Sequence, residues 1–442
     1  MFAYRLVGLF LIAGFLAVAA VSAQPALPKG VKVQPAVKPN VPAVPNVPKG
    51  GVPDGKNLGI PAVPPGVNPG IPVLPGTPGL PVSPQPKLDN IKWPTELNGK
   101  TLEIIVREMR THSDPAVREA AVRTLPAFGP KSRELGGNDL IDAMTKELDW
   151  NVRLAALSVG PTVILGFAKA PDELLNRGLG TIVNYLTHEY MQVRFDVIGI
   201  VGSIGPFIRI NQPSVVQKLS VRAREAGSWQ MRRAAIVALG NVGLGKQTGD
   251  TPDLRDPPDA QSVTALLDIL RLDQCAAVRR EAVNSLISLG PVAPVQQKTW
   301  KSSLDNLFKL NIEKDKSVLL WARVLILRNG PDGLKGNEVH LDAIAQMLGV
   351  AAPASRLEAC AALAVLGEDA KSKLGNVIDI INNAKEEPEV VIAAITAAAS
   401  IPSKSAVVVP ILVNVKAMHK NEEVKRVATE AIDYLTMGKK KN

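Results

Sequence analysis

One pattern of seventeen residues recurs along the chain and strongly restricts the folds open to it. DPAVREAAVRTLPAFGP spans residues 114–130, and CAAVRREAVNSLISLGP spans residues 275–291. A length of 442 residues alone would suggest two to four independent domains. An internal repeat instead predicts a row of similar units, each packed against the next.

Nine copies of the pattern can be aligned on the residue that follows the first buried aliphatic. These marker positions are Arg118, Arg153, Arg194, Arg232, Arg279, Leu319, Arg356, Val391 and Lys425. Successive markers are separated by 35, 41, 38, 47, 40, 37, 35 and 34 residues. A period near 40 with two helical stretches per unit predicts an all-α fold, an α-solenoid or superhelix.

Each copy contains its own helix boundaries. Asp114 is placed to cap a helix, and Pro115 suits the first turn, where a missing amide costs nothing. Gly129 predicts a left-handed residue that ends the helix, and Pro130 prevents its continuation. The same ending is predicted at Gly160-Pro161, Gly205-Pro206, Gly290-Pro291 and Gly330-Pro331.

These units resemble those of the HEAT-repeat family, over about residues 95–434. The resemblance implies about nine HEAT-type helical hairpins in residues 95–436, and a bacterial, exported protein. It also implies ladders between an acidic residue and the marker arginine of neighbouring units. The expected ladder residues are Asp114, Arg118, Asp149, Arg153, Glu189, Arg194 and Arg279. Leu319 and Val391 replace the arginine in units six and eight, where we expect apolar contacts instead.

The first 23 residues have the pattern of a secretory signal peptide. Arg5 precedes an apolar run, and small residues lead to an expected cut after Ala23. Cleavage would give a periplasmic, cell-surface or secreted protein, whereas retention would leave a membrane anchor. No later stretch is long and apolar enough to be a transmembrane segment.

Residues 24–94 are expected to form a disordered linker rich in Pro, Gly and Val. They contain 19 of the 36 prolines, which block helices, with interleaved glycines that prevent a rigid rod. Plain tethering is the expected role, and weak binding to an envelope surface is the alternative.

The formal charge of +10 is concentrated outside the repeats. Residues 24–94 carry seven lysines against two aspartates, and Lys439, Lys440 and Lys441 lie in a basic tail, 437–442. The repeats themselves are close to neutral, so nucleic acid is not an expected partner.

The residues that carry chemistry do not form a recognisable catalytic arrangement. The four histidines lie in different units without metal-ligand spacing, and the two cysteines cannot form a disulfide framework. We therefore expect no enzyme activity, no metal and no cofactor. A lyase acting on a chromophore is suggested only by the resemblance, because some bilin lyases contain short HEAT-like units.

One stretch has the composition of a binding surface. VRAREAGSWQMRR, residues 221–233, brings Arg222, Arg224, Arg232 and Arg233 around Trp229. Guanidinium groups beside an aromatic ring could grip an acidic surface; alternatively, Trp229 packs between repeats while the arginines form ladders. Phe195 and Arg280, which follow their markers, are the other candidate partner-binding residues. The aspartate-rich insertion 243–262 is interpreted as a solvated loop.

Together these features predict a non-enzymatic, exported, monomeric scaffold for protein–protein interaction. An unidentified protein partner would bind on the curved surface of the solenoid. The alternative is polyanion binding, to nucleic acid or acidic polysaccharide, through the Arg222–Arg233 cluster and the lysine tail. A steep loss of affinity with salt would distinguish the alternative.

Overall fold

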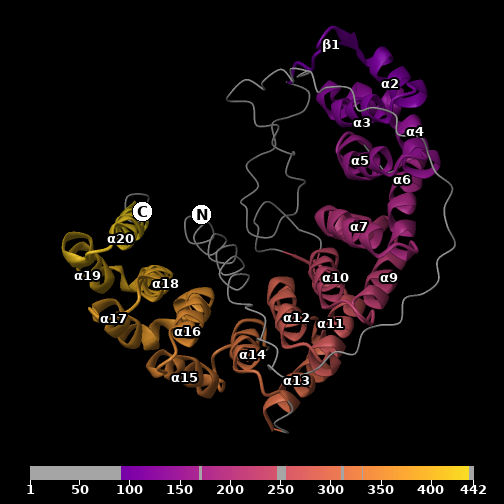
Figure 1. Ribbon diagram of the computed structural model, residues 1–442. Helices are drawn as coiled ribbons and strands as arrows, with labels where there is room; N and C mark the ends of the chain where they lie inside the picture. Colours follow the sequence, from indigo (N-terminus) through magenta and orange to yellow (C-terminus); the bar gives the residue numbers. More distant parts are fainter. Residues whose placement is uncertain (1–90, 169–171, 246–254, 310–312, 331, 438–442) are drawn as a thin grey trace, which may run out of the picture. The chain divides into compact units, whose positions relative to one another are not determined.

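The computed structural model describes residues 91–437, apart from 169–171, 246–254, 310–312 and 331. The predicted signal peptide, residues 24–90 of the predicted linker, nearly all of the basic tail and the centre of the 243–262 insertion lie outside the described residues. Within these limits, the chain is a succession of helical hairpins (Figure 1).

Each unit consists of a first and a second helix. The first helices are α2 (Leu102–Thr111), α4 (Pro130–Lys146), α6 (Glu173–Asn184), α8 (Pro206–Asn211) with α9 (Ser214–Arg222), α11 (Ala260–Leu272), α13 (Pro294–Lys309), α15 (Glu338–Gln346), α17 (Leu374–Asn382) and α19 (Ser405–Met418). The second helices are α3 (Pro115–Thr124), α5 (Trp150–Gly160), α7 (Met191–Ile204), α10 (Trp229–Val242), α12 (Ala276–Leu289), α14 (Lys316–Asn329), α16 (Pro353–Leu366), α18 (Pro388–Ala399) and α20 (Glu422–Met437). These nine pairs, counted over the described residues, confirm the predicted α-solenoid.

The two sets of helices form two layers. In one layer, second helices pack against second helices, as α7 does against α10 and α10 against α12. In the other, α2 packs against α4 and α9 against α11. The buried apolar side chains between the layers form a single continuous core. Each unit therefore needs its neighbours to bury its apolar side chains, as expected of a repeat array.

The predicted helix boundaries are correct at some units and wrong at two. The Asp114 carboxylate accepts a hydrogen bond from the Ala116 amide at 2.9 Å, and Pro115 occupies the first turn. Left-handed glycines end helices at Gly129, Gly205 and Gly290, with φ of 63°, 66° and 83°.

Gly160 and Gly330 do not have the predicted left-handed conformation. Gly160 is right-handed, with φ of −50°, and α5 continues into the short turn η3 (Pro161–Leu165). A Cβ at Gly160 would occupy the place of the end of the buried Met144 side chain, which would have to move. Gly330 is extended, with φ of −69°, and a side chain there would strike the Ile326 carbonyl.

A small β-hairpin precedes the first helix and departs from the all-helical prediction. Strand β1 (Glu96–Leu97) pairs antiparallel with β2 (Lys100–Thr101) around a turn at Asn98 and Gly99. Just before it, Trp93 meets the Phe167 ring edge-on, with centroids 5.6 Å apart. Folded structure therefore includes Trp93, which the sequence assigned to the linker.

No single helix among the described residues combines the length and apolar character needed to cross a membrane. Pro388–Ala399 and Pro402–Met418 meet that test only as a pair, and they are bent by 92°.

Candidate functional site

The marker arginines join neighbouring repeats, as the ladder at Arg279 illustrates. Its Nε and one terminal nitrogen donate to the two carboxylate oxygens of Glu313, in the next unit, at 2.6 and 2.8 Å. The other terminal nitrogen donates to the carbonyl oxygens of Asp273 and Gln274 at 2.8 and 3.1 Å. One guanidinium thus fixes both its own hairpin loop and the following one.

The same link recurs at four other joints between units. The pairs are Arg118 with Glu147, Arg194 with Glu225, Arg232 with Asp273 and Arg356 with Glu386. The acidic partner always lies in the loop just before the second helix of the next unit.

The resemblance implied that the ladder would include Asp114, Asp149 and Glu189. The ion pairs between units do not involve these residues. Asp114 and Asp149 cap α3 and α5, and Asp149 accepts from the amides of Asn151 and Val152. A carboxylate directed at the first turn of its own helix is unavailable to a neighbouring unit.

The ladder pairs stabilise the charged forms of their members. The hydrogen bond from Arg118 is the main reason that the pKa of Glu147 lies below its usual value. Burial alone would raise the pKa of Glu313, but hydrogen bonds from Arg279 and two backbone amides hold it below its usual value. The same Glu313 hydrogen bond raises the pKa of Arg279.

Three joints lack this ion pair among the described residues. Val391 is buried and Leu319 is partly buried at their joints, where apolar contact was expected. Arg153 has no carboxylate partner; it donates to the Glu147 carbonyl and lies over the Trp150 ring, 5.9 Å from its centroid.

The predicted arginine cluster is already occupied by internal partners. Arg222 pairs with Glu225, Arg224 with Asp268, Arg232 with Asp273 and Arg233 with Glu281. The N–O distances are 2.9, 3.2, 2.6 and 2.8 Å. The cluster is therefore locally neutralised and offers little attraction to a polyanion.

Arg280, another candidate, also has a structural role. It donates to Glu358 at 2.9 Å and to the Ser317 hydroxyl at 3.3 Å, and Ser317 donates to Glu358 at 2.9 Å. The network ties α12, α14 and α16 together across three successive units.

Two of the predicted binding residues remain available at the surface. Phe195 on α7 is 40% exposed and Trp229 on α10 is 42% exposed. Trp229 is therefore not buried between repeats, which was the alternative interpretation of the sequence. Met191 and Val237 are also exposed on these adjacent helices. We call these four residues the apolar strip; sequence reasoning missed Met191 and Val237, although they lie four and eight residues from Phe195 and Trp229.

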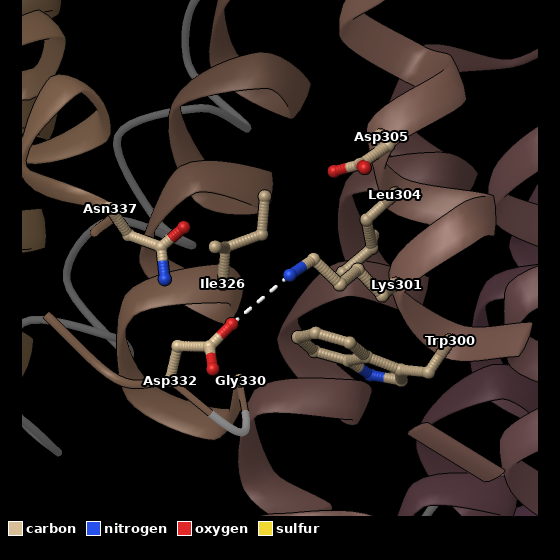
Figure 2. A pocket seen from close by; sticks show the side chains of 8 residues that line it. All are labelled: Trp300, Lys301, Leu304, Asp305, Ile326, Gly330, Asp332 and Asn337. Carbon is tan, nitrogen blue, oxygen red and sulfur yellow. Dashed lines mark hydrogen bonds and ion pairs between the residues drawn. The ribbon is translucent and has the colours of Figure 1, made fainter. Parts of the chain in front are cut away.

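A shallow pocket lies elsewhere, between α13 and α14, and its volume of about 270 Å³ includes open solvent. Its lining residues are Trp300, Lys301, Leu304, Asp305, Ile326, Gly330, Asp332 and Asn337. Lys301 and Asp332 pair across it at 3.0 Å (Figure 2). Over the residues described, His, Cys, Asp and Glu form no group suited to a metal ion.

Comparison with known proteins identifies the fold. No protein-family model matches the chain, and no curated protein matches its sequence. Importin beta, in an ammonium sulfate crystal form, has a TM-score of 0.52 and 11% identity, covering 75% of this chain and 46% of its own. Kap95p, from a structure concerning RanGDP, has a TM-score of 0.52 and 12% identity, with 76% and 45% covered. The chain thus spans less than half of either protein, and the likeness shows a HEAT-like helical repeat fold.

Proposed function

We propose that this protein is a non-enzymatic scaffold that binds a protein partner on the layer of second helices, through the apolar strip. The observation that supports this proposal most directly is the exposure of Phe195 on α7 and of Trp229 on α10, two helices that pack against each other. Aromatic residues in such positions are typical centres of binding energy in protein interfaces.

The electrostatics support a protein partner over a polyanion. Arg232 and Arg233 flank the strip, but each is bound to a carboxylate of the following unit. Binding there would depend on short-range apolar contact and shape rather than on counterion release. Kap95p, a solenoid of similar fold, binds RanGDP, which is a precedent for protein recognition by this architecture.

The proposal includes export and a tether, which rest on the sequence alone. Residues 1–23 would direct the chain across a membrane, and residues 24–94 would hold the repeats away from the point of attachment. A monomer is proposed, because a repeat array can bury its core without a second copy.

Partner capture by the full chain tests the function. We expect the double variant Phe195→Ala, Trp229→Ala to lose the proteins captured by the wild type, because both changes remove exposed rings without opening the core. Leu272→Ala is the matched control, since Leu272 is exposed on α11 in the other layer. Arg224→Glu should also leave capture unchanged.

Capture that survives the double variant would overturn the assignment to the apolar strip. Capture lost equally in Leu272→Ala would do the same, since it would indicate non-specific adhesion. Strong capture of heparin or DNA, abolished by Arg224→Glu, would favour the polyanion alternative.

A further inference from the structure

Four aromatic rings cluster at the joint between units two and three. Trp150 begins α5, Tyr185 and His188 lie in the loop after α6, and Tyr190 immediately precedes α7. The His188 ring centroid lies 5.8, 5.6 and 5.5 Å from those of Trp150, Tyr185 and Tyr190. We call these four residues the aromatic shelf. The chain has only four tyrosines, and two of them are here.

The shelf replaces a ladder pair. His188 lies two residues before the cap of α7, where Glu147 lies relative to the cap of α5, and it likewise accepts the capping residue's amide, at 3.2 Å. A histidine in the carboxylate's place leaves Arg153 without its usual partner, and Arg153 stacks on Trp150 instead. His112 and His419 accept the capping amides of α3 and α20 in the same way, at 3.1 Å, so the features that set this joint apart are the cluster of rings and the marker arginine without a carboxylate partner. Such departures from a repeated structural rule are expected where a protein has a functional site.

Three of the rings are packed within the joint, and the fourth is open to solvent. The Tyr185 hydroxyl donates to the Met144 carbonyl at 2.5 Å, and the guanidinium of Arg153 covers Trp150. Tyr190 is 65% exposed, and Trp150, Tyr185 and His188 are partly buried. Rings held in this way lose little further entropy when a ligand binds.

The geometry and charge of the shelf indicate a class of ligand. The His188 ring stacks on Tyr185, with 22° between the planes, and is tilted by 34° from Trp150 and by 39° from Tyr190, so the rings pack against one another and Tyr190 presents its ring at the exposed edge of the cluster. Proline rings of a polyproline II helix pack against exposed aromatic faces such as that of Tyr190, and the three-residue period of this helix puts every third residue on one edge. Glu189, exposed between His188 and Tyr190, forms no ion pair with any described residue, so it favours a basic ligand residue.

We propose that the aromatic shelf binds an extended, proline-rich segment of a partner protein, with a lysine or arginine of that segment facing Glu189. The inference rests on the proposed function, because it assumes that this protein binds proteins. It adds a second contact, with its own chemistry, beside the apolar strip. Tyr190 and Met191 are consecutive, so a single partner can reach both surfaces.

The test is a fluorescence-anisotropy titration of the full chain with a labelled synthetic peptide made of two copies of VPPKPP. We expect saturable binding with a Kd of about 100 μM or tighter. Tyr190→Ala should weaken it at least about tenfold, and Tyr190→Phe should retain it, because the ring makes the contact. Glu189→Lys should weaken it about fivefold and reduce its dependence on salt. Leu272→Ala is the control and should bind as the wild type does, with circular dichroism confirming that every variant is folded.

Three outcomes would overturn the proposal: no saturation at millimolar protein, equal affinity for a peptide with alanine in place of proline, or unchanged binding by Tyr190→Ala. The apolar strip is tested by different variants, so either surface can fail alone. Loss of partner capture in the strip variants with intact peptide binding would leave the shelf in place.

Discussion

Removing the Glu313 carboxylate should destabilise the repeat array far more than removing an exposed one. Glu313 is only 3% exposed. It accepts two hydrogen bonds from Arg279, at 2.6 and 2.8 Å, and one each from the amides of Lys314 and Asp315, at 2.9 and 2.8 Å. The change Glu313→Ala leaves a guanidinium and two amides without their acceptor.

The size of this effect follows from burial. Breaking a buried ion pair by deleting one partner costs about 3–5 kcal/mol. Because the Arg279 side chain keeps 17% exposure, some water can reach it, and we expect a loss near the lower end, about 3 kcal/mol. The matched control is Glu423→Ala in α20, whose pair with Arg426 is 55–56% exposed and should contribute less than about 1 kcal/mol.

Urea unfolding at pH 7, followed by circular dichroism at 222 nm, measures both variants. The double variant Arg279→Leu, Glu313→Leu should recover much of the lost stability, since apolar residues remove the unpaired charge. If Glu313→Ala shifts the urea midpoint no more than Glu423→Ala does, the ladder does not hold the units together, and packing alone explains the array.

Two further predictions concern acid and close packing. The pKa values of Glu147 and Glu313 in the folded protein lie below the usual 4.5. The stability that these two carboxylates give to the fold is therefore fully present above about pH 4.5 and is lost as the pH falls through the lowered values. A urea midpoint that stays constant between pH 5 and 3 would contradict this. Gly202→Ala should be less stable than Gly199→Ala, because its new Cβ would lie 3.2 Å from the Cα of Ala238 and α7 and α10 would have to shift slightly to accept it. Gly199→Ala, on the same helix with no atom within 4 Å of the new Cβ, should be neutral or stabilising in thermal melts, and equal losses at both glycines would refute the packing argument.

The hairpin array was predictable because its signals are local. Capping residues such as Asp114 and helix-ending glycines such as Gly129 act within a few residues of the chain, so their meaning does not depend on distant contacts. Gly160 was misjudged because its reason is distant: Met144, on another helix, fills the space that a side chain would need.

The ladder partners escaped prediction because their distance from the marker varies. The carboxylate follows its arginine by 29 residues at Glu147, 41 at Asp273 and 34 at Glu313. The first helices and loops differ in length, so a search at fixed spacing fails. Counted backwards from the next helix cap, these three lie two residues away, whereas Glu225 lies three residues and Glu386 one residue before its cap, so a search of the last three residues before each cap would have found all five. It would also have found His188.

The exposed residues could not be separated from buried ones by repeat position alone. Phe195 and Leu320 occupy equivalent positions after their markers, yet Phe195 is 40% exposed and Leu320 is buried. On α14, the Arg280 side chain of α12 meets the Glu358 side chain of α16 beside Ser317, three residues before Leu320. Such an arrangement depends on how three units pack together, which no single copy of the repeat encodes.

The rings that we propose as a binding surface also help to hold the joint between units two and three. The marker arginine makes no ion pair there. On the side of the second helices, the Tyr185 hydrogen bond to Met144 and the Trp150–Tyr185 contact, with centroids 6.3 Å apart, link the two units, and on the side of the first helices Arg133 pairs with Asp172 at 2.6 Å. Trp150→Ala should therefore lower both stability and peptide affinity, whereas Tyr190→Ala, which removes an exposed ring, should lower affinity alone. A Tyr190→Ala variant with an unchanged urea midpoint would separate recognition from folding at this joint, because both functions otherwise depend on one cluster of side chains.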